Sequence, residues 1–594
     1  MSYQAPLDDM NFLLHSQSDP GSDPGPDRSE DGDDSVLLQQ AARLAQQSWA
    51  ACNASGDQQG CRLIKSEIRG QVQSEVQLAD DIHQAFRRYA NDGWMGLTMP
   101  QRWGGQQQSE VLGTLVGEML TSSNHALSML PALTMSACRA LIAHASDALR
   151  DRYLPPIIAG QWTATMCMTE AHCGSDLGLV RSRAEPHAGG YRIYGSKIFI
   201  SYGSHNASDN IIHLVLARLP EAPAGIKGLS LFLVPQKRPD AQGNWQQDNH
   251  VLCTGIEEKM GIHASPTCSL SFEGAHGDLV GREHDGIHAM FTMMNEMRLG
   301  TCLQGVGLSE HSYQKSLAYA RQRLQMRSLS GVKNPQGDAD AIIEHPDVRR
   351  MLLTQKAFAD GGRALANFCA QLLDKQVADP NDKDAALLLE LLTPIAKGFC
   401  TEAGLESASH AIQVYGGHGY IRDNGVEQLY RDGRIATLYE GTTGIQALDL
   451  LGRKVLGNQG TSLRLFTKKI HRLCQQHQQH PELAGLVSLL HPYAKQWPEL
   501  SMTIGVRAMK NHDEAGAASV DFLMYSGYVT LGYFHLRAAL QAWTLLQQSG
   551  SPFSDEFLQQ KIQLAGFYLQ RILPRSAGHH AAVQAPLSSL DQKF

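Results

Sequence analysis

The stretch Tyr430-Arg-Asp-Gly-Arg-Ile-Ala-Thr-Leu-Tyr-Glu-Gly-Thr-Thr-Gly-Ile-Gln446 places a single carboxylate, that of Glu440, between an apolar run and a glycine. Gly441 lets the backbone come close to a ligand, while Leu438 and Tyr439 keep water away from the carboxylate. Poor hydration raises a carboxyl pKa toward neutrality, which suits a catalytic base. The stretch therefore predicts Glu440 as a base. A plain helix boundary, which often pairs Glu with Gly, is the alternative.

Length and composition describe an ordinary globular enzyme. The 594 residues suggest three or four domains. Hydrophobic residues make up 42%, charged residues 19%, and the formal net charge is -8. This balance gives no general electrostatic reason to bind nucleic acid or an acidic membrane. Residues 16–34 hold seven acidic side chains against the single Arg28, and they are expected to form a flexible surface loop within an N-terminal segment, residues 1–34.

The cysteines and the apolar runs indicate in which cellular compartment the protein is expected. The eleven cysteines are scattered without a CxxC pair or a Cys/His ligand spacing, so neither a metal site nor a disulfide framework is expected. The first ten residues lack the basic start and apolar core of a signal peptide, and an uncharged apolar run of 18 residues does not occur. We expect a cytoplasmic protein without a transmembrane segment.

Hydrophobic periodicity divides the rest of the chain into four domains. A helical domain is expected over residues 35–160, a β domain over 161–285, a helical bundle over 286–455 and a C-terminal helical domain over 460–594. The polar piece Ser328–Ala341 is expected to be a loop inside the bundle. Because strands do not alternate with helices, a doubly wound dinucleotide-binding sheet is disfavoured, despite Gly416-Gly-His-Gly419.

Two further motifs lie in and beside the β domain. In Met166-Cys-Met-Thr-Glu-Ala-His-Cys-Gly-Ser-Asp176, hydroxyl groups and small residues could donate to a flat polar ring or a phosphate. A Gly-Ser turn capped by Asp176 explains that motif equally. In Gly195-Ser-Lys-Ile-Phe-Ile-Ser201, strand alternation puts Phe199 and Ser201 on one face, which suits the edge of an isoalloxazine. A half-buried strand is the alternative there.

The third motif decides among these alternatives. Gln413-Val-Tyr-Gly-Gly-His-Gly-Tyr-Ile-Arg422 precedes Arg431-Asp-Gly-Arg-Ile435 and Tyr439-Glu-Gly-Thr-Thr-Gly-Ile-Gln446. With the domain order, over roughly residues 75–455, these pieces resemble the acyl-CoA dehydrogenases, FAD enzymes that introduce a double bond between the α and β carbons of an acyl-CoA thioester. Length, the opening Tyr3–Leu14 and Ala515–Leu523 resemble a longer branch, which includes 3-methylmercaptopropionyl-CoA dehydrogenases and bacterial fatty acyl-CoA dehydrogenases.

The resemblance implies a fold and a set of site residues. The fold is mainly α with a central β-barrel domain between helical bundles, plus extra C-terminal helices. Glu440 would remove the α proton, and its backbone N–H would bind the thioester carbonyl as an oxyanion-type donor. The implied substrate-binding residues are Ser175, Arg298, Tyr439 and Gly441. The implied FAD-binding residues are Met166, Met168, Thr169, Gly174, Ser175, Phe199, Ser201, Arg323, Gln325, Gln413, Gly417 and Thr442, with Gln413 and Gly417 serving a neighbouring subunit.

The chain departs from the family pattern at three places. Ala171-His172-Cys173 stands where the family has Pro, a variable residue and Ala, which changes the stiffness of that loop. Phe199 stands where many members have Trp. Met326-Arg327 replaces the usual Phe-Gly after Gln325, which weakens the case for a pyrophosphate contact at Arg323. His172 as a second acid/base or a metal ligand is a further alternative to a solvated loop histidine.

Three functions remain open from sequence. The leading one is a dehydrogenase of fatty acyl-CoA or 3-methylmercaptopropionyl-CoA that passes electrons to electron-transfer flavoprotein. An acyl-CoA oxidase would share the base and the flavin but use oxygen. A flavin-containing relative that binds nucleic acid through its helical tail is the third, and the mild, dispersed charge of that tail argues against it. A homo-oligomer is implied, with a dimer favoured over a tetramer.

Overall fold

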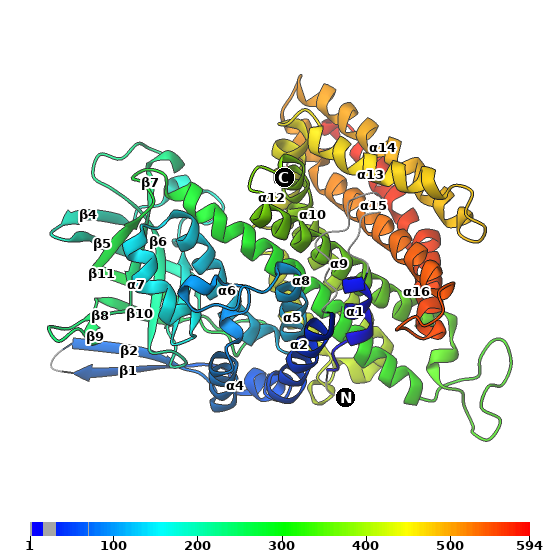
Figure 1. Cartoon of the computed structure of the whole chain (residues 1–594), viewed down its shortest axis with the longest axis horizontal. Coiled ribbons are helices and arrows are strands. Elements are labelled where there is room, and N and C mark those ends of the chain that lie inside the picture. Colours follow the sequence, from blue (N-terminus) through cyan, green and yellow to red (C-terminus); the bar gives the residue numbers. More distant parts are fainter. Residues whose placement is uncertain (1–2, 16–30, 69–70, 594) are drawn as a thin grey trace. The chain divides into compact units, whose positions relative to one another are not determined.

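The computed structural model describes residues 3–15, 31–68 and 71–593 and divides into two compact units (Figure 1). One, here called the helical unit, comprises Met1–Ala42, Glu110–Ser122 and Thr301–Phe594. The other, here called the sheet unit, comprises Arg43–Ser109 and Ser123–Gly300. Helix α8 (Gly286–Gln322) begins in the sheet unit and ends in the helical unit. The order of elements confirms a mainly α fold with a central sheet and additional C-terminal helices.

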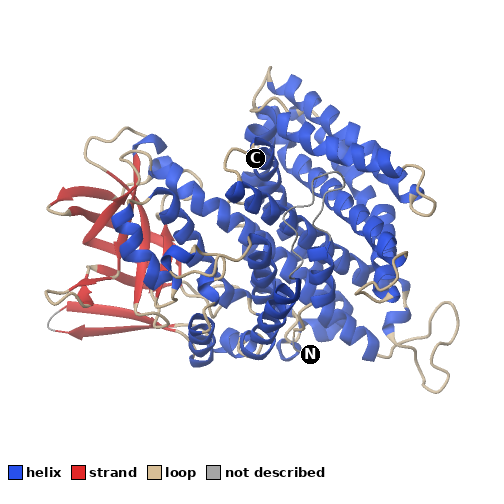
Figure 2. Ribbon diagram, viewed as in Figure 1, coloured by secondary structure: helices blue, strands red, loops and turns tan. Residues whose placement is uncertain are grey.

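The sheet unit is built around a seven-stranded sheet, drawn in red in Figure 2. Its strands run in the order β10-β11-β5-β4-β6-β3, and β7 pairs with both β11 and β6. They are β3 (Trp162–Cys167), β4 (Arg183–His187), β5 (Gly190–Ser201), β6 (Asn210–Arg218), β7 (Leu229–Pro235), β10 (Val251–Ile256) and β11 (Thr267–Val280). Most pairs are antiparallel, and β3 runs parallel to β6. A short pair, β8 (Lys237–Pro239) and β9 (Trp245–Asp248), forms a separate two-stranded sheet.

Strands β6 and β7 read as continuous apolar runs because both faces are covered. Nearly every residue of these two strands is buried, including Leu214, Phe232 and Leu233. A strand with two buried faces shows an apolar run instead of alternation. Both strands lie within the β domain expected over residues 161–285. The loop that begins at Met168 leaves the sheet at the end of β3, beside β6.

Helix α6 (His125–His144) packs against β3 in the core of the sheet unit. It begins where the Asn124 side chain accepts a hydrogen bond of 3.0 Å from the backbone N–H of Leu127. Among the described residues, it is the helix long and apolar enough to span a bilayer, yet 72% of its most apolar window is buried. Its apolar surface is therefore core. The unit's other helices are η1 (Ala45–Trp49), α3 (Asn53–Gln59), α4 (Asp80–Asn91), η2 (Trp94–Gly96), η3 (Gln101–Trp103), α7 (Asp147–Ile158), η4 (Leu177–Leu179) and η5 (Ile226–Gly228).

The helical run expected over 35–160 contains an antiparallel β-hairpin. Strand β1 (Arg62–Ile68) pairs with β2 (Gln71–Gln77), with Arg62 opposite Gln77. Val76 is fully buried and its N–H donates to Ser204 Oγ at 3.2 Å, whereas Ile64 is half exposed. The hairpin therefore belongs to the surface of the sheet unit. It was not predicted, because its sequence mixes polar and apolar residues without a clear strand pattern.

The helical unit contains the long helices of the chain. Those before residues 430–446, the stretch that contains Glu440, are α1 (Leu7–His15), α2 (Asp31–Leu44), α5 (Glu110–Ser123), η6 (Ile342–Glu344), α9 (Pro346–Ala378) and α10 (Lys383–Tyr415). Around that stretch lie η7 (Gly416–Tyr420), η8 (Arg422–Asn424), α11 (Glu427–Gly433), η9 (Arg434–Thr437), α12 (Thr443–Leu448) and η10 (Asp449–Leu456). The C-terminal helices are α13 (Thr461–His477), α14 (Ala484–Ala508), α15 (Asp513–Leu546), α16 (Asp555–Phe567), η11 (Tyr568–Ile572), η12 (Leu573–Arg575), α17 (Ser576–Val583) and η13 (Leu587–Leu590).

Glycines bring the central helices of this unit into backbone contact. A Cβ at Gly305 of α8 would lie 2.1 Å from the Cys400 carbonyl oxygen of α10. A Cβ at Gly404 would likewise lie 2.6 Å from the Gly305 oxygen. Only glycine at both positions allows α8 and α10 to approach this closely. Backbone contact thus fixes the spacing of α8 and α10, the two helices that anchor the Tyr439–Thr443 segment.

A buried charge network joins helices that are far apart in the sequence. At its centre, Arg363 of α9 donates to Glu118 of α5 at 2.8 Å and to Glu310 of α8 at 2.7 Å. Asp9 of α1 accepts from Lys356 at 2.6 Å and pairs with Lys561 of α16. Buried charges persist when each is paired and hydrogen-bonded. The network therefore joins five helices of the unit.

Two expected loops have different outcomes. Ser328–Ala341 is a loop, as predicted, and it folds around Asp340, whose buried carboxylate accepts N–H groups of Ser328 at 2.8 Å and Asn334 at 2.7 Å. Of the acidic segment 16–34, residues 16–30 lie outside the described residues. Residues 31–34 belong to α2, so the loop prediction was wrong for these four.

Candidate active site

Glu440 lies on a sharp connection between η9 and α12 in which two successive residues are left-handed. Its φ is 56° and that of Gly441 is 92°. A left-handed glutamate is unusual because its Cβ crowds the backbone, and such strain collects at functional sites. The side chain is half-buried, and its Oε2 atom is shielded from solvent. The helix-boundary alternative is correct for position, since Thr442 caps α12, but it does not explain this backbone.

Two buried side chains hold the peptides that follow Glu440. Lys397 of α10 donates from Nζ to the Gly441 carbonyl oxygen at 2.6 Å. Gln446 of α12 donates from Nε2 to the Glu440 carbonyl oxygen at 3.1 Å. Both donors are completely buried. Gly441 is required here, because a Cβ would lie 2.5 Å from Gln446 Nε2.

The residues flanking Glu440 are hydrogen-bonded to α8 and α10. The Tyr439 hydroxyl donates to Gln304 Oε1 of α8 at 2.6 Å, and burial raises the pKa of the Tyr439 phenol. Thr443 donates from Oγ1 to Glu402 Oε1 of α10 at 2.6 Å. The Thr442 hydroxyl caps α12 by accepting the N–H of Ile445 at 3.2 Å. Every residue from Tyr439 to Thr443 is thus anchored by a hydrogen bond or by its helix cap.

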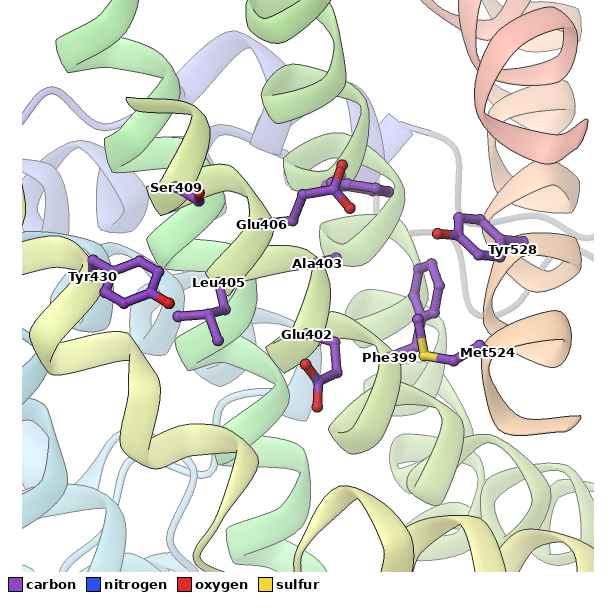
Figure 3. Close-up of a pocket in the computed structure, with 10 residues that line it drawn as sticks. Phe399, Glu402, Ala403, Leu405, Glu406, Ser409, Tyr430, Met524 and Tyr528 are labelled. Carbon is purple, nitrogen blue, oxygen red and sulfur yellow. The ribbon is translucent and has the colours of Figure 1, made fainter. Parts of the chain in front are cut away.

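A cavity of about 330 Å³ lies on the α15 side of α10 in the same unit. Figure 3 shows Glu402, Glu406 and Ser409 along α10, with Met524 and Tyr528 of α15 facing them. Glu402 is the side chain that also bonds Thr443, and Glu406 accepts from Arg575 at 2.7 Å. The cavity is therefore lined by Glu402, the same side chain that anchors Thr443 beside Glu440.

In the sheet unit, the loop after β3 is fixed by a buried ion pair. Lys197 of β5 donates from Nζ to Glu170 Oε1 at 2.9 Å and to the Met168 carbonyl oxygen at 3.0 Å. Glu170 also accepts from Ser182 Oγ at 2.6 Å and from the Arg181 N–H at 2.8 Å. Burial alone would raise the pKa of the Glu170 carboxyl, but Lys197 and these donors lower it to about 2. The loop is therefore rigid where it leaves the sheet.

The loop presents the hydroxyl groups that the sequence motif predicted. Thr169 is half-buried, with its carbonyl oxygen bonded to the Ile198 N–H at 2.9 Å, and Gly174 and Ser175 are exposed. Met166 and Met168 are half-buried at the edge of the core. His172 donates from Nε2 to the Leu179 carbonyl oxygen at 2.9 Å. Its imidazole is thus engaged in shaping the loop.

Phe199 lies at an irregularity in β5. The register to β11 shifts between the pairs Cys268 with Ile200 and Leu270 with Lys197. At this bulge Phe199 has a φ of 59° and is 60% exposed, whereas Ile200 is buried and Ser201 is half-buried. A bulge re-aims a side chain. The sheet unit therefore presents an aromatic ring with a hydroxyl two residues away.

The ends of α8 and α10 meet in the helical unit. Tyr319 stacks on Tyr415 with ring centroids 4.1 Å apart, and its hydroxyl lies 2.9 Å from His418 Nδ1. Beyond Tyr319, Arg323 and Gln325 are exposed and hydrogen-bonded to each other at 3.3 Å. Gln413 and Gly417 are also exposed, and a Cβ at Gly417 would meet nothing within 4 Å. The structure thus brings these four predicted positions to one region.

Arg298 is placed differently from the other predicted residues. It lies in the sheet-unit part of α8, is 4% exposed, and donates to Asn295 Oδ1 at 3.2 Å. Its contact with CoA stays a prediction.

The FAD that the resemblance implies fits both regions, taken one at a time. In the sheet unit, the exposed Phe199 ring offers an apolar face, and the Thr169, Ser175 and Ser201 hydroxyls offer polar edges, which suits a flat heterocycle. In the helical unit, the Arg323 guanidinium and the open backbone at Gly417 suit a pyrophosphate. Bound there, FAD would supply the hydride acceptor.

Several residues that shape the site were not predicted from the sequence. They are Glu170 and Lys197 behind the loop after β3, and Gln304, Lys397, Glu402 and Gln446 behind the base. A signal existed for two of them. Lys397 is the one charge in the apolar run Pro394–Cys400, and Lys197 occupies the inward phase of an alternating strand. A lysine in such a position requires a buried acceptor.

Comparison with protein-family models accounts for most of the chain. The model for the N-terminal domain of acyl-CoA dehydrogenases matches residues 61–161, the middle domain matches 165–275, and the C-terminal domain matches 284–456. A model described as acetyl-CoA dehydrogenase C-terminal like matches 466–591. The extra C-terminal helices therefore have a family model of their own.

Individual relatives and structures agree with the models. The chain is 38% identical to the 3-methylmercaptopropionyl-CoA dehydrogenase of Ruegeria pomeroyi over 98% of both chains. It is 31% identical to a butyryl-CoA dehydrogenase of Syntrophomonas wolfei, over 91% of this chain and 89% of that one. The fold matches Caenorhabditis elegans ACDH-11 in complex with C11-CoA, with a TM-score of 0.80, 19% identity and coverage of 96% and 91%. The chain belongs to the acyl-CoA dehydrogenase family, whose members are FAD-dependent oxidoreductases.

Proposed function

We propose that the protein oxidises a short acyl-CoA thioester, with 3-methylmercaptopropionyl-CoA as the preferred substrate and Glu440 as the base. The substrate is suggested by the 38% identity to the enzyme of that name over 98% of both chains, against 31% for a butyryl-CoA dehydrogenase. A longer fatty acyl-CoA is the competing substrate. The tests below separate substrate from base.

The observation that carries the base assignment is the left-handed backbone at Glu440 with its shielded carboxylate oxygen. Strained backbone on a non-glycine residue persists when its surroundings enforce it. Here hydrogen bonds to the carbonyl oxygens of Glu440 and Gly441 do so. A carboxylate with little hydration is the more basic one, so Glu440 can take the α proton of the thioester.

Neighbouring groups have supporting roles in this proposal. The backbone N–H of Glu440 binds the thioester carbonyl oxygen, which acidifies the α proton. Tyr439 and Gly441 line the substrate, and Ser175 and Arg298 serve its CoA end. Met166, Met168, Thr169, Gly174, Phe199, Ser201 and Thr442 contact the flavin. Bound FAD would supply the acceptor for the β hydride. A short acyl chain makes few apolar contacts, so we expect the residues nearest the thioester to determine substrate specificity.

We further propose a homodimer in the cytoplasm that passes electrons to electron-transfer flavoprotein. Exposure of Gln413 and Gly417 beside Arg323 and Gln325 supports a dimer, because these are the positions that complete the FAD site of a neighbouring subunit in the family. All eleven cysteines are free thiols, ten of them buried, which suits a reducing compartment. The Ruegeria pomeroyi and Syntrophomonas wolfei relatives are both named dehydrogenases, which favours a protein acceptor over oxygen.

The test of the substrate is anaerobic flavin reduction by acyl-CoAs from four carbons upward, including 3-methylmercaptopropionyl-CoA. We expect kcat/KM highest for the last. A maximum at long chains would overturn the substrate assignment. Stoichiometric peroxide in air without an added acceptor would instead show an oxidase.

The test of the base is Glu440→Gln, which keeps the size of the side chain. We expect bound FAD to be retained and flavin reduction to fall by about 10⁴-fold or more, as for loss of a central acid/base group. Glu390→Gln, at an exposed position on α10, is the matched control and should leave the rate unchanged. Near wild-type reduction by Glu440→Gln would rule out this base.

A further inference from the structure

Lys397 and Gln446 fix the orientation of the two peptides that follow the base. The Lys397 ammonium bonds the Gly441 carbonyl oxygen at 2.6 Å, and the Gln446 amide bonds the Glu440 carbonyl oxygen at 3.1 Å. These two carbonyls define the backbone on the C-terminal side of Glu440. With both held, the left-handed turn at Glu440 and Gly441 cannot relax to an ordinary conformation without breaking a buried hydrogen bond.

The two donors are themselves set in a rigid place. Lys397 and Gln446 are each 0% exposed and belong to different helices, α10 and α12. A buried ammonium keeps its acceptor because leaving it costs the full desolvation of the charge. The bond from α10 therefore resists movement of the base-bearing stretch more strongly than an exposed bond would.

Helix α15 of the C-terminal region packs against the turn of α10 that carries Lys397. A Cβ at Gly398, next to Lys397, would lie 2.6 Å from Leu523 Cδ2 of α15 and 3.5 Å from Gln446 Cβ. Reciprocally, a Cβ at Gly527 of α15 would lie 2.1 Å from the Phe399 ring. Leu523 therefore fills the notch at Gly398, and Phe399 fills the notch at Gly527. This interlocking places α15 directly against the α10 turn that carries Lys397.

We infer that Lys397 and Gln446 are positioning residues for Glu440, and that α15 takes part in the reaction indirectly by holding them through Leu523. The inference rests on the proposed role of Glu440 as the base. It assigns the C-terminal helices a part in catalysis: they fix the geometry of proton abstraction without contacting substrate.

The first test compares Lys397→Met and Gln446→Met, which keep side-chain volume and remove the donors. We expect the rate of flavin reduction to fall about 10- to 100-fold, since a displacement of about 1 Å costs up to that much, with little change in KM. The kinetic isotope effect of α-deuterated substrate should rise, because proton abstraction is the slowed event. The effect of β-deuterated substrate should not rise with it. Lys495→Met, on the exposed face of α14, is the control for loss of a lysine charge.

A second readout does not depend on turnover. Hydrogen–deuterium exchange of the protein alone should become faster in peptides covering residues 437–446 in both variants and remain unchanged in the sheet unit. A merely structural role would lower the Tm and the FAD content while leaving the isotope effects at their wild-type values. That pattern would overturn the inference.

The role of α15 is tested by Leu523→Ala against Leu536→Ala. Both leucines are buried in the same helix, 13 residues apart, so each substitution creates a cavity of similar size. We expect Leu523→Ala to slow reduction about 3- to 10-fold with the raised α-isotope effect. Leu536→Ala should lower the Tm without that signature. Equal kinetics for the two variants would exclude a special role for Leu523.

The outcomes also separate this inference from the base assignment. If Glu440→Gln retains activity, the proposed base is wrong and the positioning role fails with it. If Glu440→Gln is inactive and Lys397→Met reduces flavin normally, the base stands and the positioning role alone is wrong. In the Glu440→Gln background, Lys397→Met should cause no further loss, because there is no base left to orient.

Discussion

Lys197 Nζ lies 2.9 Å from Glu170 Oε1, and neither side chain is accessible to water beyond a few per cent. The ammonium also bonds the Met168 carbonyl oxygen at 3.0 Å, so one buried lysine of β5 fixes both the backbone and a side chain of the loop that follows β3. That loop and the exposed Phe199 are attached to the same strand. Their relative positions are therefore set by a single short segment of β5.

Lys197→Met should unfold or loosen the sheet unit, because it leaves the Glu170 carboxylate buried without its counter-charge. Loss of one partner of a buried pair costs about 3–5 kcal/mol of unfolding free energy. Denaturant unfolding and the FAD content of the purified protein measure the effect. The double variant Lys197→Met, Glu170→Gln should recover part of the stability. Lys227→Met, at an exposed position of the sheet unit, should change it by less than about 0.5 kcal/mol.

Acid should destabilise the sheet unit through His213. Burial lowers the pKa of this imidazole from 6.5 to about 4. The folded state then binds its proton less readily than the unfolded state, so stability is complete above pH 6.5 and falls as the pH drops toward 4. The loss approaches about 3 kcal/mol at 1.36 kcal/mol per pKa unit.

Thermal unfolding between pH 4 and 7 tests this, with His213→Gln as the variant. We expect a lower Tm than wild type at pH 7, because the bond to Thr165 Oγ1 at 2.7 Å is disturbed, but a shallower fall in acid. An unchanged acid slope would show that other groups govern the transition. His205, whose pKa burial lowers to about 3, is expected to contribute in the same direction.

Arg363→Met should be among the most damaging substitutions in the helical unit. The guanidinium bonds Glu118, Glu310 and Asp360 at 2.7–2.9 Å and is 1% exposed. Its removal leaves three buried carboxylates short of a partner, at a cost of about 3–5 kcal/mol. Urea unfolding measures the loss. Adding Glu118→Gln to Arg363→Met should restore part of it, whereas strict additivity would mean that the two residues do not couple.

Two glycines of α15 should respond in opposite directions to the same change. Gly527→Ala places a Cβ 2.1 Å from the Phe399 ring and should destabilise by about 1–3 kcal/mol through overpacking. Gly516→Ala meets nothing within 4 Å and should stabilise by up to about 1 kcal/mol through helix propensity. The difference in Tm between the two variants is the measurement. A stabilised Gly527→Ala would mean that α10 and α15 are further apart than described.

Much of the fold followed from periodicity in the sequence. The runs that became β5, β6 and β7 were visible because buried strands and bounded apolar segments have distinctive patterns. The hairpin of β1 and β2 was missed because its residues are mixed polar and apolar. The acidic composition of residues 31–34 predicts a loop, whereas in the structure they form the first turn of α2.

Residue type alone supports the predictions of a base at Glu440 and of hydroxyl donors at Thr169 and Ser175, and these roles stay predictions. Phe199 shows the limit: strict alternation predicts its ring in phase with Ser201, but the bulge that turns the ring outward depends on pairing with β11. Lys397 and Gln446 lie beyond that limit, since each acts on a backbone carbonyl that sequence cannot place beside it.

The charge network around Arg363 has a consequence for biosynthesis. Asp9 pairs with Lys561, 552 residues further along the chain, and both belong to the same unit. While a ribosome is still making the protein, Asp9 of α1 and Asp360 of α9 emerge long before Lys561 of α16, the cation that pairs with both. The sheet unit, whose residues end at Gly300, meets no such delay. We expect nascent chains to hold a folded sheet unit beside unfinished helices, and hence to depend on chaperones until α16 has been translated.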